Sequence, residues 1–400
     1  MNLDLQILRN AITGQAAAFR CVTDYQPAGG AGDKVFPPTY EGGKYATEKR
    51  IDPGTGEIRD CVLLDSVQSQ ANRMELALLE AHRADEIALP LVVTRFDQDQ
   101  MLRKFTVSSL DAPHRVADAL FRDSLLDGVI FRQSPAGRIL DTADIRNATG
   151  LFGLCPTALV FGLWDSTGPR GGLGAKFQRA LVSEIVGYDS IEGMRTSSRI
   201  DPAQIMLGAG PLYDRKSGSA GKPAWTLEQA EGKSKLKKSG KPSEANHGNV
   251  TPSIAQGGFT ISRARQTTTL SLSVLRRLRF PLNGAADSDF DVDVAARTAL
   301  AALGLAAGTL SRTDTDLRSR CQLFPESEPV WQFLDRPGQA PQEFDLNPDA
   351  SLGLFREAVE EAKQLGLPWQ GVIELTPSLE LVELVRRSQE LASESEAEQA

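Results

Sequence analysis

The sequence predicts an α+β protein, and three stretches support this prediction. Residues 65–83 (DSVQSQANRMELALLEAHR) place apolar residues on one stripe at helical spacing: Val67, Ala71, Met74 and Leu78. Residues 291–308 (DVDVAARTALAALGLAAG) are rich in alanine, which favours a second long helix. Residues 258–280 (GFTISRARQTTTLSLSVLRRLRF) open with alternating apolar and polar residues and carry many β-branched side chains, as strands do. The sequence contains no internal repeat or heptad pattern, which argues against a solenoid or a coiled coil.

The composition is that of a globular protein with a sizeable core. The chain has 400 residues, of which 41% are hydrophobic and 24% are charged. No apolar run approaches the length of a membrane span, and the start MNLDLQILRN lacks the charged and apolar regions of a signal peptide. The four cysteines and three histidines are scattered, so neither a metal site nor a disulfide framework is predicted. We therefore expect a cytoplasmic protein without a cofactor and without membrane contact.

The net charge of −8 hides an uneven distribution. From Asn283 onward acidic residues outnumber basic ones by more than two to one, whereas the preceding part has a small basic excess. The acidic part is compatible with a solvated surface or with a protein partner. The rest of the chain can present basic surface to a polyanion, because the local field rather than the total charge guides such binding.

The first third of the chain predicts several elements. Residues up to about Asp60 indicate an opening helix, a strand and a long loop. The helix over 65–83 should start with Asp65 as its N-cap, with Gln68 completing a capping box. Apolar segments over 89–110 indicate strands, and an amphipathic helix is expected over 116–126. His114, just before that helix, is either a catalytic residue or a capping and packing residue.

Two pairs of polar residues lie one turn apart on the polar face of the helix over 65–83. They are Gln68 with Asn72, and Ser69 with Arg73. Such residues commonly form a solvated helix face. Hydrogen-bonding groups near a helix start also suit the oxygens of a sugar-phosphate backbone. The residues alone leave both interpretations open.

The most distinctive stretch is TALVFGLWDSTGPRGGLGAKFQRALVSEIVGYD, residues 157–189. Residues 157–161 predict a buried strand, 164–174 a glycine-rich turn, and 177–186 a helix that stops at Gly187. A strand, a glycine loop and a helix in this order direct backbone N–H groups at a phosphate. However, the P-loop order of glycine, lysine and Ser or Thr is absent, and so is the third glycine of the dinucleotide fingerprint. The loop is therefore either a plain connection or a phosphate site of another kind.

Residues 190–257 predict a long insertion. Arg195 and Arg199 lie among small hydroxyl residues, and 214–241 is rich in Gly, Ser and Lys with a basic excess. A structureless segment of this length inside a compact chain is either functional or disordered. We interpret it as an arm with a mobile basic tip, while a solvated charge run without a ligand stays open.

The C-terminal part combines charge clusters with further elements. The strand region over 258–280 ends in Arg276, Arg277 and Arg279. Residues 283–293 predict an acidic loop that is either a solvated turn or a cation site. A helix near 354–365, a strand at 372–375 and a last helix follow, and 386–400 is expected to be a disordered acidic tail.

No catalytic set assembles from these residues. A serine-hydrolase elbow needs Gly-x-Ser-x-Gly, and residues 164–168 lack the first glycine. The recurring features are a polar helix start, a glycine loop before a helix, a basic arm and arginine-rich strands. Together they suit a single-stranded nucleic acid that is held by its backbone.

Three motifs, in this order along the chain, resemble one known family. They are QSQANR at 68–73, ALVFG at 158–162 and QRALVSEI at 178–185. These motifs are similar to the backbone subunit of type I CRISPR effector complexes. The longer stretch VFGLWDSTGPRGGLGAKFQRALVSEIVG resembles the type I-G (formerly I-U) branch of these RAMP proteins. The resemblance is specific over about 60–200 and extends more weakly to 250–280.

The resemblance implies a modified RNA-recognition-motif (ferredoxin-like) palm that carries inserted finger and thumb elements. Residues 1–189 would form the first part of the palm with its finger insertions, and 190–257 the thumb. Residues 258–385 would complete the palm and add the acidic C-terminal region, before the tail over 386–400. In such proteins the chain binds RNA but does not cut it, so no catalytic residue is expected.

The resemblance also implies a role in antiviral defence. Several copies would polymerise along one CRISPR RNA as a helical filament and present it for pairing with the target DNA strand, together with other subunits of the effector complex (Cascade). Contacts with the RNA are expected from Gln68, Ser69, Asn72, Arg73, Trp164, Ser166, Lys176, Arg179, Arg195 and Arg199.

Two alternatives fit the same residues. One is an α/β enzyme that acts on a phosphate-bearing substrate through the loop over 168–176, with His114 or Asp165 as the base. The other is a RAMP protein that cleaves RNA through a loop aspartate such as Asp165 or Asp201.

Overall fold

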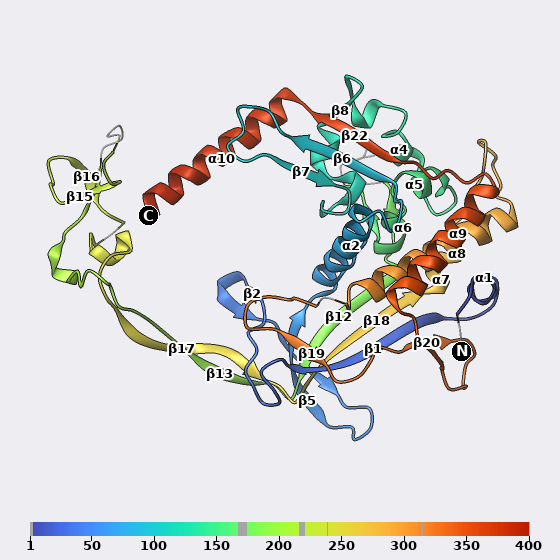
Figure 1. The fold of residues 1–400 in the computed structure, drawn as a ribbon, viewed down its shortest axis with the longest axis horizontal. Helices are drawn as coiled ribbons and strands as arrows, with labels where there is room; N and C mark the ends of the chain where they lie inside the picture. The colour runs from blue at the N-terminus through green and yellow to red at the C-terminus, as the bar shows by residue number, and fades with distance from the viewer. Residues whose placement is uncertain (1–2, 167–173, 216–220, 238, 314, 400) are drawn as a thin grey trace. The chain divides into compact units, whose positions relative to one another are not determined.

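The chain folds into two compact units, which are described separately (Figure 1). The structure is a computed structural model that describes residues 3–166, 174–215, 221–237, 239–313 and 315–399. Unit 1 comprises Met1–Asp97, Phe105–Ile191 and Phe259–Leu381. Unit 2 comprises Gln98–Lys104, Glu192–Gly258 and Val382–Ala400.

The centre of unit 1 is an antiparallel sheet that has eight strands in the described part of the chain. Their order is β21-β20-β1-β18-β12-β5-β4, and β19 pairs with β1. The strands are β1 (Ala18–Pro27), β4 (Thr47–Ile51), β5 (Ile58–Asp65), β12 (Leu181–Tyr188), β18 (Arg263–Ser271), β19 (Leu323–Pro325), β20 (Trp331–Leu334) and β21 (Gln342–Phe344). In the middle of the sheet Leu270 lies opposite both Phe19 and Leu181, and all three side chains are buried.

Helices cover one face of this sheet, and the main core lies between the two layers. They are α1 (Leu5–Thr13), α2 (Val67–Arg83), α6 (Thr157–Phe161), α7 (Leu272–Leu275), α8 (Phe290–Leu310) and α9 (Pro348–Gln364). Figure 1 shows α2, α8 and α9 together on this side. Nearly every residue of α8 is buried, because its alanines and glycines let the helix approach the sheet closely. A Cβ on Gly304 would lie 2.9 Å from the Leu270 Cδ1, so the helix needs glycine there.

A second sheet of unit 1 has five strands in the described chain, in the order β7-β6-β22-β8-β9. These are β6 (Leu91–Phe96), β7 (Phe105–Ser108), β8 (Ser124–Leu126), β9 (Val129–Ile130) and β22 (Val372–Pro377). Strands β6 and β22 run parallel, whereas the other pairs are antiparallel. The shorter elements of unit 1 are β2 (Thr39–Tyr40), η1 (Glu41–Gly43), β3 (Lys44–Tyr45), η2 (Arg115–Ala117), α3 (Ala119–Arg122), η3 (Phe131–Gln133), α4 (Ile139–Thr142), α5 (Thr149–Leu154), β10 (Leu163–Trp164) and β11 (Lys176–Phe177).

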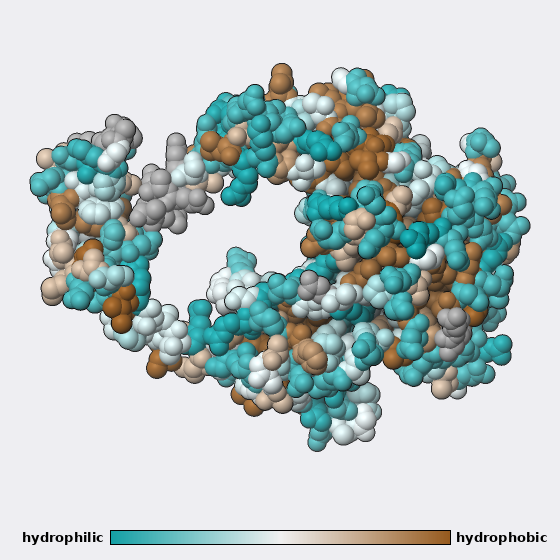
Figure 2. All heavy atoms as spheres, viewed as in Figure 1, coloured by the Kyte–Doolittle hydropathy of each residue, from teal (hydrophilic) through white to brown (hydrophobic). Residues whose placement is uncertain are grey.

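The predicted α+β class is confirmed, since long helices pack on mainly antiparallel sheets. The helices expected over 65–83 and 291–308 are α2 and α8, and the strands expected over 89–110 are β6 and β7. Hydrophilic residues cover much of the face drawn in Figure 2, with hydrophobic residues gathered in patches. Among the described helices, none has both the length and the apolar character needed to cross a membrane.

The prediction for 157–186 was wrong, because helix and strand are exchanged. Thr157–Phe161 is the helix α6, and β12 occupies the place of the expected helix, with Gly187 inside the strand. A buried run of five apolar residues fits either element. In β12, Leu181, Ser183 and Ile185 are buried while Val182 is exposed, which is the alternation of a strand. The expected phosphate-binding helix start is therefore absent from the described residues of this stretch, and 167–173 of the glycine loop lie outside them.

Two further predictions need correction. The acidic loop ends at Asp289, which is the N-cap of α8, so Asp291 and Asp293 belong to the helix. Asp293 is buried and accepts a hydrogen bond of 2.6 Å from Arg297 Nη2, and the described residues contain no cluster suited to a metal ion. The helix expected over 116–126 is reduced to α3, and the strand β8 follows it. Since Asp118 caps α3 and Asp123 ends it, the helix is only one turn long.

The described residues of unit 2 form two small sheets and most of a long helix. Strands β13 (Ile191–Arg199) and β17 (Val250–Thr260) pair with each other, and β14 (Tyr213–Arg215) pairs with β15 (Trp225–Thr226) and β16 (Gly232–Lys235). Between them lie η4 (Leu207–Ala209) and η5 (Pro242–Ala245). The described residues of the segment expected to be a mobile tip thus include short strands around a small core of Leu212, Leu236 and Ala245.

The last helix, α10 (Leu379–Gln399), extends through the region where a disordered tail was expected from residue 386. Glu383 pairs with Arg386 at 2.8 Å and with Arg387 at 2.6 Å. Ion pairs three and four residues apart stabilise a helix, which gives a physical reason for the difference.

Candidate nucleic-acid interface

The start of α2 is organised by Ser66 and Asp65, in different roles from those expected. Ser66, not Asp65, is the N-cap, and its hydroxyl accepts a hydrogen bond of 3.2 Å from Ser69 N. Asp65 is the last residue of β5, and its side chain is fully buried. The expected capping box with Gln68 therefore does not form. The side chain of Gln68 is exposed.

Asp65 is the acceptor of a network that includes two of the predicted RNA contacts. Its carboxylate accepts hydrogen bonds from Ser69 Oγ at 2.8 Å, Gln70 Nε2 at 2.7 Å and Arg73 Nε at 2.9 Å. Arg318 Nη2 donates to the same carboxylate at 2.9 Å. A buried carboxylate needs such partners, so Ser69 and Arg73 hold α2 against the sheet. Whether they also contact RNA stays a prediction.

Gln68 and Asn72 face a pocket of about 400 Å³, which we call the α2 pocket. Its lining residues are Gln68, Asn72, Pro113, His114, Arg115, Phe161, Gly162, Leu163, Trp164, Lys176, Phe177 and Arg179. No Asp or Glu is among these described lining residues. The structure thus brings together five of the predicted contacts: Gln68, Asn72, Trp164, Lys176 and Arg179.

One wall of the α2 pocket is the short ladder of β10 and β11. Leu163 pairs with Phe177, which points inward and is buried, and Trp164 pairs with Lys176. Trp164 is 59% exposed, and Lys176 Nζ lies 5.7 Å from the centroid of its indole ring. The predicted contact Ser166 is exposed two residues after Trp164, and the structure does not place it among the lining residues.

Arg179 is a half-buried cation without an ion pair among the described residues. Its Nη1 donates one long hydrogen bond, 3.4 Å, to the carbonyl oxygen of Val67 at the start of α2. Burial lowers the pKa of Arg179, and the nearby positive charge of Arg115 lowers it further. A bound anion would stabilise the charged guanidinium against both effects, which makes Arg179 a suitable phosphate ligand in the α2 pocket.

A buried ion pair between Glu75 and Arg115 lies at the α2 pocket, and the sequence did not predict it. Arg115 donates to Glu75 from Nε at 2.6 Å and from Nη2 at 2.8 Å, and from Nη1 to the carbonyl oxygen of Gly162 at 2.9 Å. Burial raises the pKa of Glu75 to about 7, although Arg115 opposes this shift. The pair fixes the turn that leads into Trp164. A glutamate directly after Met74, at the edge of the apolar stripe of α2, was the signal that could have revealed it.

The predicted contacts Arg195 and Arg199 lie in unit 2 on β13. Arg199 Nη2 donates a hydrogen bond of 2.8 Å to the carbonyl oxygen of Gly248, so this side chain ties the two ends of the arm together. Arg195 is exposed, and its aliphatic part packs over Gly257, where a Cβ would lie 2.7 Å from Arg195 Cδ. Arg195 therefore keeps a guanidinium accessible to a ligand.

The two candidate bases of the enzymatic alternative, His114 and Asp165, differ in their exposure. His114 is exposed at the α2 pocket. Asp165 is 2% exposed and forms an ion pair of 3.1 Å with Arg132, and its backbone N–H donates to the carbonyl oxygen of Ala175 at 2.9 Å. Residues 168–173 of the glycine loop lie outside the described residues.

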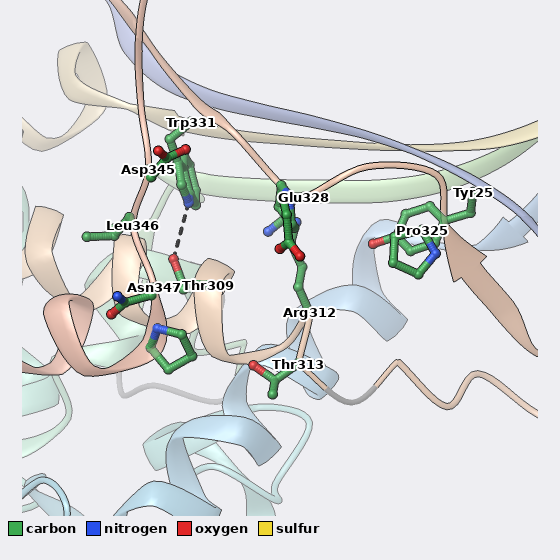
Figure 3. Close-up of a pocket in the computed structure, with 12 residues that line it drawn as sticks. Tyr25, Thr309, Arg312, Thr313, Pro325, Glu328, Trp331, Asp345, Leu346 and Asn347 are labelled. Atoms are coloured by element: carbon green, nitrogen blue, oxygen red, sulfur yellow. Dashed lines mark hydrogen bonds between the residues drawn. The ribbon is translucent and has the colours of Figure 1, made fainter. Parts of the chain in front are cut away.

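A second cavity, of about 530 Å³, lies at the end of α8 (Figure 3). Its lining includes the carboxylates of Glu328 and Asp345 as well as Arg312, and Trp331 Nε1 donates to Thr309 Oγ1 at 3.1 Å. Mixed charge of this kind is less suited to a phosphate chain than the α2 pocket.

One family model matches part of the chain. No curated protein matches the chain. Residues 19–191 match the family model described as CRISPR-associated protein GSU0053 (Cas_GSU0053). The matched region runs from β1 to the start of β13 and includes every residue that lines the α2 pocket. Over this region, which contains the candidate site, the chain thus matches a CRISPR-associated protein family.

Proposed function

We propose that this chain is the guide-RNA-binding backbone subunit of a type I CRISPR surveillance complex, of the type I-G branch. The α2 pocket carries this proposal, because Lys176 and Arg179 lie there without a carboxylate partner in the described chain. Gln68 and Asn72 add amides that can donate to phosphate and ribose oxygens. A protein that must accept any guide sequence should bind these groups and leave the base edges unread along most of the strand.

The connectivity of unit 1 supports the proposal of an RNA-recognition-motif-like palm. Elements β1, α2, β12, β18, α8 and β20 occur in β-α-β-β-α-β order along the chain, with other elements between them, and their strands lie in the order β20-β1-β18-β12. The segment Glu192–Gly258 of unit 2 is inserted between β12 and β18. An insertion between the two strands of a hairpin suits the thumb expected for this family.

We propose further that several copies assemble on one CRISPR RNA in the cytoplasm, together with other subunits of the effector complex. The guide bases between successive contacts would then pair with the target DNA strand. The acidic C-terminal part of the sequence offers a partner of opposite charge for the basic segment over 214–241 of a neighbouring copy.

We propose that the chain binds RNA without cutting it. The surroundings of both loop aspartates support this proposal. Asp165 is buried in its ion pair with Arg132. Asp201 is 7% exposed and accepts hydrogen bonds from the backbone N–H groups of Ala203 and Gly248, and these bonds lower its pKa. A carboxylate engaged in this way is a poor general base. Incubating the purified chain with end-labelled RNA and Mg²⁺ should leave the RNA intact, and cleavage that depends on either aspartate would refute the proposal.

Co-expression with a CRISPR array tests the main proposal. The purified chain should carry RNA of discrete length and absorb strongly at nucleic-acid wavelengths. The double variant Lys176→Glu/Arg179→Glu should lose this RNA, whereas Arg277→Glu, an exposed arginine outside the α2 pocket, should retain it. Wild-type protein that purifies without RNA would overturn the proposed function. If the double variant retains as much RNA as the wild type, the RNA binds outside the α2 pocket.

A further inference from the structure

The α2 pocket contains an exposed aromatic surface that a phosphate backbone does not need. Trp164 is 59% exposed and lines the pocket, and Lys176 Nζ lies 5.7 Å from the centroid of its ring. A large apolar ring left in water is unfavourable, and nucleobases stack readily on such rings. The position of Trp164 therefore points to a flat ligand.

The amides of Gln68 and Asn72 face the same pocket from α2. They lie four residues apart on one exposed helix face, and neither side chain has a hydrogen-bond partner among the described residues. Each amide offers both a donor and an acceptor. Such groups match the polar edge of a base better than they match a phosphate, which only accepts.

We propose that the α2 pocket takes up one nucleobase of the bound RNA, stacked on the indole of Trp164, with its polar edge against Gln68 and Asn72. This inference rests on the proposed RNA-binding function and adds a base contact to it. Lys176 and Arg179 then bind the phosphates on either side of that nucleotide. The volume of about 400 Å³ is within the range of small-molecule sites and accommodates one nucleotide.

The pocket accepts all four bases rather than selecting one. An amide can rotate to exchange its donor and acceptor, so Gln68 and Asn72 adapt to different base edges. Stacking on tryptophan is also tolerant of sequence. The absence of a carboxylate among the described lining residues removes the acceptor that would favour cytosine through its amino group.

The buried pair of Glu75 and Arg115 holds the aromatic platform in place. Arg115 donates to the carbonyl oxygen of Gly162 at 2.9 Å, two residues before Trp164, and its guanidinium lies 5.5 Å from the centroid of the Phe161 ring. The indole is thereby attached to the core through a short and well-bonded turn. A rigid aromatic surface loses little conformational entropy when a base stacks on it.

A comparison of intact and abasic RNA tests this inference. The affinity of the full chain is measured by fluorescence anisotropy for a short oligouridylate, an oligoadenylate of the same length, and an oligomer of the same ribose-phosphate backbone without bases. We expect both intact oligomers to bind within a few-fold of each other and about tenfold or more tightly than the abasic one, as loss of one stacking contact predicts. Trp164→Ala should remove most of this difference between the intact and the abasic oligomers. Trp164→Phe should restore most of the difference.

Phe324→Ala is the matched control, because Phe324 is 61% exposed in unit 1 and does not line the α2 pocket. This variant should bind all three oligomers as the wild type does.

If Trp164→Ala changes the affinity for intact and abasic oligomers equally, or changes neither affinity, the base site is refuted while the proposed function stands. A strong preference for one base would refute the tolerant pocket. If the wild-type chain binds none of the three oligomers, the proposed function itself fails, and so does the base site. A pocket occupied by a protein side chain instead would leave all oligomer affinities insensitive to Trp164.

Discussion

Some of the arginines near the start of α2 form an ion pair with a carboxylate, and others do not. Arg73 and Arg318 both contact the buried Asp65, and Arg115 contacts Glu75. Among the described residues, Arg179 has no carboxylate partner and donates one long hydrogen bond to a backbone carbonyl. The paired arginines contribute to folding because they compensate buried charges, whereas the unpaired one is available for an anion. The residue type alone does not separate these roles.

Arg179→Ala should weaken RNA binding without weakening the fold. Loss of one charge-assisted phosphate contact, worth about 1.5–3 kcal/mol, predicts an affinity lower by about tenfold or more. The slope of log K against log salt concentration should decrease by about 0.7, as expected for one phosphate on a single strand. Anisotropy titrations over a series of salt concentrations measure both. Arg277→Ala serves as the control, and equal affinities of the two variants would contradict the role assigned to Arg179.

Arg73→Ala should reduce the free energy of unfolding. The variant leaves the buried Asp65 with one guanidinium instead of two. Because Arg73 is partly exposed, we expect a loss of about 2 kcal/mol, below the range for breaking a fully buried pair. Asn72→Ala, at the neighbouring exposed position of the same helix, should change stability by less than about 0.5 kcal/mol. Urea unfolding of both variants measures this difference. Equal midpoints would show that the buried Asp65 carboxylate is compensated without Arg73.

Glu75 should make stability depend on pH. Burial raises its pKa from 4.5 to about 7 in the folded chain, so the folded state holds the proton more tightly than the unfolded state between these values. The free energy of unfolding should therefore fall as the pH rises from about 4.5 to about 7 and then level off. Glu75→Gln removes this contribution. Unfolding of both proteins at about pH 5 and about pH 8 measures it, and identical pH dependence would contradict the raised pKa.

At the scale of elements, the turn between α6 and β10 positions one wall of the α2 pocket. Gly162 has a φ of +88°, a conformation that other residues avoid. A Cβ there would lie 2.9 Å from Arg179 Cγ and 3.2 Å from the carbonyl oxygen of Phe177. The turn, Arg179 and the ladder of β10 and β11 therefore depend on one another.

Gly162→Ala should lower both stability and RNA affinity. We expect a loss of about 1–3 kcal/mol from backbone strain, together with a displaced Arg179. Gly353→Ala on α9 is the control, since a Cβ there meets nothing within 4 Å and alanine favours a helix. Thermal unfolding and RNA titration of the two variants test the prediction. A Gly162→Ala variant as stable as Gly353→Ala would show that the turn tolerates a side chain.

The exchange of helix and strand over 157–186 has a simple physical origin. The helix prediction rested on Phe177, Leu181 and Ile185, and a spacing of four residues fits the period of a strand as well as that of a helix. Ser183 is the residue that distinguishes them, because it is buried in β12 through hydrogen bonds to Gln70 Oε1 at 2.9 Å and Thr268 Oγ1 at 2.8 Å. A buried serine with partners on other elements has no signal in a hydrophobicity pattern.

At the scale of the whole molecule, unit 1 contains the large core and the complete α2 pocket, and Glu192–Gly258 is an insertion between two of its strands. Its own core is small in the described chain and consists mainly of Leu212, Leu236 and Ala245. Unit 1 therefore has its own core and all the described residues of the α2 pocket, so we expect it to fold, and to keep the proposed RNA site, without the insertion.

Replacing residues 202–247 by a short Gly-Ser linker between β13 and β17 should separate RNA binding from assembly. The variant should keep the thermal midpoint of unit 1 and bind a short oligonucleotide about as tightly as the wild type. It should fail to assemble in several copies on a guide made from a CRISPR array, which size-exclusion chromatography with light scattering would measure. Assemblies of wild-type size would show that the arm is not needed for polymerisation.

The sequence by itself determined the α+β class, the long helices α2 and α8, the strands β6 and β7, and the polar residues at the start of α2, because each depends on local periodicity and composition. Only the tertiary structure decided which polar residues are free to bind. It placed Asp65 beside Ser69 and Arg73, and it left Gln68, Asn72, Lys176 and Arg179 around one pocket. The reason is that a side chain's availability depends on contacts with residues far away in the chain, such as Arg318 with Asp65, and no local pattern records them.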